Sequence, residues 1–83
     1  MSTTRYFDEQ VLRKRPYLTV PLCRAVLAHP LEAIAQPDGR IRHWGRVNLP
    51  GEEETRILRV VTLADGETIH NAFLDRGFRE DEP

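Results

Sequence analysis

The apolar residues of this chain repeat with a helical period up to about residue 30 and with a period of two after it, and this switch limits the possible folds more than any other feature. Such a change of period predicts helices followed by strands. The first predicted helix spans residues 7–15 and ends at Pro16, because a residue before proline avoids the helical region. The second begins after Thr19, a residue type suited to capping, and ends before Pro30. The apolar stripe of this second helix consists of Leu22, Cys23, Val26 and Leu27.

Turn residues divide the rest of the chain at regular intervals, at 37–39, 50–53 and 65–66. The segments between them, at 33–36, 40–49, 55–63 and 68–74, are predicted strands. The expected fold is therefore α+β, with two N-terminal helices packed on a three- to four-stranded antiparallel meander. We expect one domain over residues 1–83, with flexible ends at 1–6 and 79–83.

Composition excludes several classes of protein. No apolar run reaches the ~18 residues of a membrane span, and the first residues show no apolar leader, so we expect a cytoplasmic protein without membrane contact. Cys23 is the only cysteine, which rules out an intrachain disulfide and a zinc site of paired thiolates. We expect no metal and no cofactor, and a core position for Cys23.

Hairpin geometry assigns the strand side chains to faces. A two-residue turn at Asp65-Gly66 places Thr62 opposite Ile69 and Leu58 opposite Phe73. This register predicts a core face formed by Leu58, Val60, Ile69 and Phe73, and an opposite face formed by Arg59, Val61, Thr68, His70 and Ala72.

The length of the loop at 50–53 decides which face each side chain of the preceding strand, 40–49, occupies. A four-residue loop places Leu49 opposite Glu54, which turns Ile41, Gly45, Val47 and a hydrogen-bonded His43 toward the core. Arg42, Trp44 and Arg46 then lie beside Arg59 and His70. Arginine supplies 11 of the 12 basic residues, and residues 1–46 hold eight Lys/Arg against four Asp/Glu. Guanidinium groups bind phosphate and an aromatic ring stacks on a base, so we expect Arg42, Trp44 and Arg46 to bind RNA or another anion. A solvated covering of arginines is the alternative, as is a base composition rich in G and C.

Residues 36–44 (QPDGRIRHW) and 58–76 (LRVVTLADGETIHNAFLDR), with Arg15-Pro16-Tyr17, resemble a group of small uncharacterised bacterial proteins. The order of helices and meander is more distantly similar to the RelE/BrnT-like toxins of type II toxin–antitoxin systems. That resemblance implies metal-independent RNA cleavage, with His70 as acid or base and Arg59 at the phosphate. It also implies RNA or the ribosome as target and a small antitoxin-like protein as partner.

A second hypothesis belongs to a different class. The chain would be a non-catalytic interaction module that pairs with a small partner, or with itself as a homodimer, through a sheet edge or through the Arg/Trp face.

Overall fold

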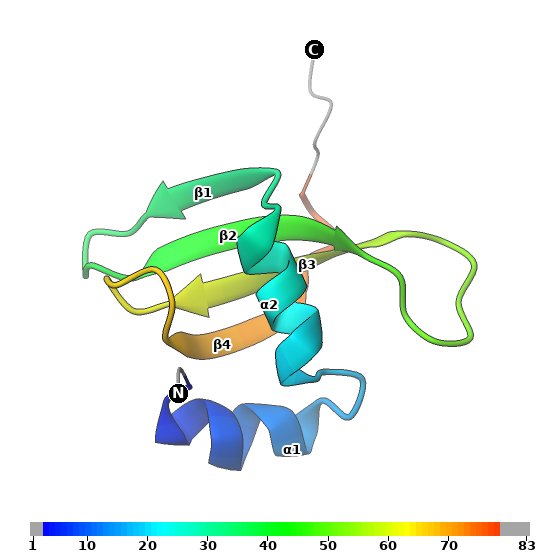
Figure 1. Cartoon of the computed structure of the whole chain (residues 1–83), viewed down its shortest axis with the longest axis horizontal. Helices are drawn as coiled ribbons and strands as arrows, with labels where there is room; N and C mark the ends of the chain where they lie inside the picture. The colour runs from blue at the N-terminus through cyan, green and yellow to red at the C-terminus, as the bar shows by residue number, and fades with distance from the viewer. Residues whose placement is uncertain (1–2, 79–83) are drawn as a thin grey trace.

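The four predicted strands form one antiparallel sheet in which each strand pairs with the next along the chain (Figure 1). They are β1 (Glu32–Ala35), β2 (Ile41–Val47), β3 (Arg56–Thr62) and β4 (Ile69–Leu74). The computed structural model describes residues 3–78, so the predicted flexible end at 79–83, and residues 1–2 of the one at 1–6, lie outside the described residues. The α+β prediction of two N-terminal helices and a meander is confirmed.

Both predicted helices form, and the second begins at its predicted capping residue. The first is η1 (Phe7–Val11), a π-helical stretch that continues as α1 (Leu12–Lys14). The second is α2 (Val20–Ala28), in which the Thr19 hydroxyl accepts the amide hydrogen of Leu22. Figure 1 shows α2 crossing one face of the sheet, whereas the first helix lies beyond the β4 edge. No helix within residues 3–78 is long and apolar enough to span a bilayer.

The core lies between this helical layer and the covered face of the sheet. Its fully buried side chains include Phe7 and Val11 from η1, Cys23 and Val26 from α2, and Leu58, Val60 and Ile69 from the sheet. Gly45 of β2 lets α2 come close, since a Cβ there would lie 3.0 Å from Val26 Cγ1 and 3.3 Å from Val26 Cα. Helix α2 therefore covers one face of the sheet and leaves the other, which we call the open face.

The register between β2 and β3 is the one predicted from the 50–53 loop. Trp44 lies opposite Arg59 and His43 opposite Val60, and the predicted core position of His43 is confirmed by its burial and by a 3.0 Å hydrogen bond between His43 Nε2 and Thr62 Oγ1. Arg42, Trp44 and Arg46 alternate onto the open face, as expected.

The register between β3 and β4 is as predicted only beside the turn. Thr62 pairs with Ile69, but a β-bulge between Val61 and Thr62 then shifts the pairing by one residue. Arg59 therefore pairs with Phe73 rather than with Ala72. The predicted core position of Phe73 is wrong, and Ala72 is the buried residue instead, because one unpaired residue reverses the faces of everything beyond it.

The start of the outer edge of β4 is covered by Thr3 and Thr4. Thr3 forms a parallel bridge with Ile69, and the Thr4 amide donates to the Ile69 carbonyl at 2.9 Å. The Ala72 amide donates to Asn71 Oδ1 at 2.8 Å. Two of the backbone groups on this edge, the Ile69 carbonyl and the Ala72 amide, are thus already bonded.

The contact between Gly45 and Val26 yields a stability prediction. Gly45→Ala should lower the free energy of unfolding by about 1–3 kcal/mol, because the added methyl group overpacks the helix–sheet interface. Val26→Ala in the same chain should recover part of that loss by removing the two Cγ atoms. Urea denaturation of both single variants and the double variant measures the coupling. Gly77→Ala is the control, since its Cβ would meet only ordinary contacts; equal losses for the two glycines would contradict the prediction.

Candidate anion-binding site

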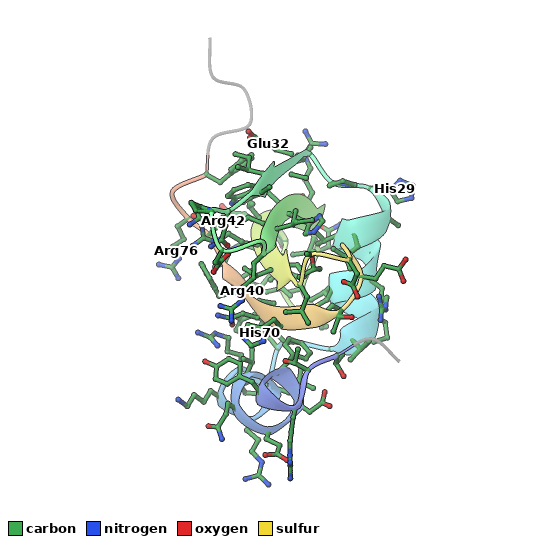
Figure 2. The ribbon with its side chains drawn as sticks, turned by 90° about the vertical axis from the view of Figure 1, so that its left-hand side faces the viewer. His29, Glu32, Arg40, Arg42, His70 and Arg76 are labelled. Atoms are coloured by element: carbon green, nitrogen blue, oxygen red, sulfur yellow. The ribbon has the colours of Figure 1, made fainter. Side chains whose placement is uncertain are left out.

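The open face carries the basic side chains that the sequence placed there. Figure 2 shows Arg40, Arg42 and His70 on the side of the sheet away from α2. They surround a hollow of about 300 Å³ whose lining also includes Arg59 and Tyr6. We call this site the basic hollow and define it by Tyr6, Arg40, Arg42, Arg59, His70 and Asn71.

Charge distinguishes the basic hollow from the rest of the surface. Among the described residues, no carboxylate lines it. A larger hollow of about 450 Å³ lies at the other end of β3 and β4, but it is lined by both signs of charge, with Glu54 and Asp75 beside Arg56 and Arg76. Of these two hollows, the basic hollow is therefore the one whose described lining carries positive charge without a carboxylate, which favours an anion.

Arg59 is held in place by aromatic rings. Its guanidinium carbon lies 4.3 Å from the centroid of the Phe73 ring and 5.8 Å from that of Trp44. Its Nε lies 3.8 Å from Asp75 Oδ2, and no hydrogen bond within residues 3–78 engages the guanidinium. Cation–π contacts and one carboxylate charge therefore orient this group while its hydrogen-bonding capacity remains unused.

Asp75 positions the neighbours of Arg59. Its Oδ2 accepts the indole hydrogen of Trp44 at 2.9 Å, and its Oδ1 accepts the amide hydrogen of Gly77 at 3.0 Å. The hydrogen bond from Trp44 is the main reason that the pKa of Asp75 lies below its usual value. Trp44 is buried, with Phe78 stacked on it at 5.2 Å between ring centroids. Trp44 thus forms the floor beside Arg59 instead of an exposed ring.

His70 occupies the bulge of β4 and is held by the N-terminal segment. Its Nδ1 lies 3.0 Å from Thr4 Oγ1, which also accepts the amide hydrogen of Phe7. The Tyr6 ring stacks on the imidazole with 5.0 Å between centroids. The other ring nitrogen, Nε2, makes no hydrogen bond within the described part of the chain. Burial, and then the charge of Arg40, lower the pKa of His70, so the neutral form is favoured at pH 7.

Arg42 and Arg40 complete the positive side of the basic hollow. Within residues 3–78, no carboxylate oxygen lies within ion-pair distance of Arg42, whereas the Arg40 guanidinium is 3.9 Å from Asp38. Arg42 and Arg59 are therefore two guanidiniums that line one hollow, and of the two only Arg59 has a carboxylate nearby, that of Asp75 at 3.8 Å. Two such groups match the oxygens of a phosphate.

The structure brings together three of the five residues singled out from the sequence, namely Arg42, Arg59 and His70. Trp44 lies below Arg59, and Arg46 faces the same side but pairs with Ile57, farther along β2. His43 lies on the helix-covered face. Within the described residues, no three His, Cys, Asp or Glu side chains lie close enough to hold a metal ion.

Three residues that line or support the site, namely Arg40, Asp75 and Tyr6, were missed by the sequence reasoning. Arg40 could have been found, because it shares the alternation of Arg42 and Arg46. Asp75 could not, because it reaches the open face only through the bulge. Tyr6 falls in a segment predicted to be flexible, and nothing local indicates that it stacks on a residue 64 positions later.

The lowered pKa of His70 can be tested by nuclear magnetic resonance. Tyr6→Ala should raise the pKa toward the ordinary value by exposing the imidazole to water, and Arg40→Gln should raise it by removing a positive charge. Because the unfolded chain binds the proton more readily just below pH 6.5, the free energy of unfolding should fall as pH falls through that range. Arg13→Gln, an exposed change elsewhere, is the control. An unchanged titration in both test variants would contradict the stated causes.

Comparison with protein-family models, with curated proteins and with solved structures found no match for this chain. The features that bear on its role are therefore those of the molecule itself. They are a hollow of about 300 Å³ lined by two guanidiniums, of which Arg59 has Asp75 at 3.8 Å, and by an imidazole whose pKa is lowered.

Proposed function

We propose that this protein binds the phosphate backbone of RNA in the basic hollow. The observation that carries the proposal is the pair formed by Arg42 and Arg59, which line one hollow that has no carboxylate in its described lining, although Asp75 lies 3.8 Å from Arg59 Nε. Orienting a guanidinium before the ligand arrives reduces the entropic cost of binding. A phosphate group offers pairs of acceptor oxygens, which the planar guanidinium recognises with two parallel N–H donors.

A base stacked beside that phosphate would use Tyr6. Its side chain is 49% exposed, and it already stacks on His70 at the rim. In this proposal Tyr6 takes the stacking role expected for Trp44, which remains the support for Arg59. Stacked single-stranded bases are the usual form in which proteins read RNA. Arg46 would extend the contact to a neighbouring phosphate along β2.

The resemblance to RelE/BrnT-like toxins adds strand cleavage to the proposal. His70 Nε2 would take the proton from a 2′-hydroxyl, whose oxygen then attacks the adjacent phosphorus and releases the 5′-oxygen, which is protonated by water. Arg59 and Arg42 would stabilise the negative charge that builds up on the phosphate oxygens. A neutral imidazole at pH 7, favoured by the lowered pKa, supports the role of base.

Binding is tested with a fluorescently labelled single-stranded RNA. Arg42→Gln should weaken binding by about tenfold, corresponding to loss of about 1.4 kcal/mol, because one charged hydrogen-bond donor to phosphate is removed. The slope of log K against log salt should become shallower by about 0.7 for each lost contact. Arg13→Gln removes the same charge from the first helix and is the matched control. Equal weakening by the two variants would mean diffuse charge attraction without a site.

Cleavage is tested by inducing expression and following growth and RNA integrity. Growth should stop, and His70→Ala and Arg59→Ala should each relieve the arrest, because each removes a group at the reacting phosphate. Far-ultraviolet circular dichroism and thermal melting establish that both variants fold. Binding without cleavage would reduce the proposal to an RNA-binding protein. Neither binding nor arrest would favour the interaction module instead.

A further inference from the structure

Within residues 3–78, the sheet has one edge that is open along its whole length. This edge is strand β1, which is exposed at all four positions, with Ile34 46% exposed. The strand itself contains neither proline nor lysine, the usual protections of an edge. At the opposite edge, Thr3 and Thr4 cover the start of β4. Strand β1 is therefore the edge that the described part of the chain leaves available for pairing.

The hydrogen-bond pattern identifies which groups of β1 point outward. The Gln36 amide donates to the Arg40 carbonyl at 2.7 Å, in the same register that pairs Ile34 with Arg42. Since bonded pairs alternate along an antiparallel ladder, the backbone groups of Ala33 and Ala35 face away from β2. Two amides and two carbonyls are thus presented on one short strand.

We propose that a second copy of this chain pairs with β1 in an antiparallel register that joins the two sheets. Ala33 of each copy faces Ala35 of the other, so that the outward groups form four reciprocal hydrogen bonds. Ile34 then meets Ile34 of the second copy on the two-fold axis. Pro37 lies just beyond the ladder and cannot donate, which keeps it short.

Charge supports the same occupant and register. Glu32 shares the open face with Ile34, and within residues 3–78 it makes no ion pair. The register places it opposite Gln36 of the second copy, next to the Arg40 that follows. Each copy would therefore contribute one Glu32 and one Arg40 to two equivalent ion pairs. Because each copy has one open edge in its described part, pairing closes at a dimer.

The register can be tested with single cysteines. Across the proposed axis the two Ile34 Cα atoms would lie about 4.5 Å apart, close to the range a disulfide needs. Ile34→Cys should therefore give a covalent dimer under mild oxidation. Glu32→Cys is the matched control, because its two copies would lie about 13 Å apart along the strands. The native Cys23 is buried, and burial raises the pKa of its thiol to about 11, so it should not compete.

Sedimentation of the chain without cysteine substitutions tests the association itself. It should show a monomer–dimer equilibrium. Glu32→Arg should weaken the dimer affinity by about tenfold, because two ion pairs are lost. The double variant Glu32→Arg with Arg40→Glu should restore that affinity. Ala35→Pro should abolish the dimer yet leave the fold intact, since that amide points outward. Ile34→Pro should unfold the edge, since that amide bonds to β2.

A monomer at every concentration, or Glu32→Cys cross-linking as fast as Ile34→Cys, would overturn the proposal. RNA binding is tested with Arg42→Gln and Arg13→Gln, which change no residue of β1. Failure of the dimer proposal and failure of the RNA-binding proposal can therefore be distinguished.

Discussion

The open face depends on one unpaired residue in β4. The bulge at His70 moves the rest of the strand by one position, which turns Phe73 and Asp75 to the side of Arg59. Without it, Arg59 would lie opposite Ala72, and neither the ring beneath its guanidinium nor the nearby carboxylate would be present. The cost of one interrupted ladder position is thus offset by a charged group that is held in a defined orientation.

The free-energy cost of burying a charge is lowered in a different way at each of the basic residues Arg59, Arg42 and His70. Arg59 is three-quarters buried and is stabilised by two rings and by Asp75 at 3.8 Å, whereas Arg42 relies on solvent. His70 avoids the cost by remaining neutral, because a desolvated imidazole beside Arg40 resists protonation. An arriving anion would relieve both restraints, since its charge favours the protonated imidazole and satisfies the guanidiniums.

The fold and half of the site follow from local patterns. The period of the apolar residues and the spacing of the turn residues were enough to predict the two helices and the four strands. The β2–β3 register was also predictable, because a slip of one residue in that pairing would bury Arg42 and Arg46. The bulge could not be predicted, since Phe73 and Ala72 are both acceptable core residues and only the packing of the whole sheet decides between them. Tyr6 and Thr4 were missed for another reason. Their contacts join the first residues of the chain to β4, and no local pattern encodes such a contact.

That long-range contact has a consequence for the order of biosynthesis. Thr4 and Tyr6 leave the ribosome well before His70, their partner, which is made 66 residues after Thr4. Residues 5–69 must therefore be synthesised before the rim of the basic hollow can form. A nascent chain stalled before β4 would contain the helices and three strands but not the complete basic hollow, which can form only after β4 has been made.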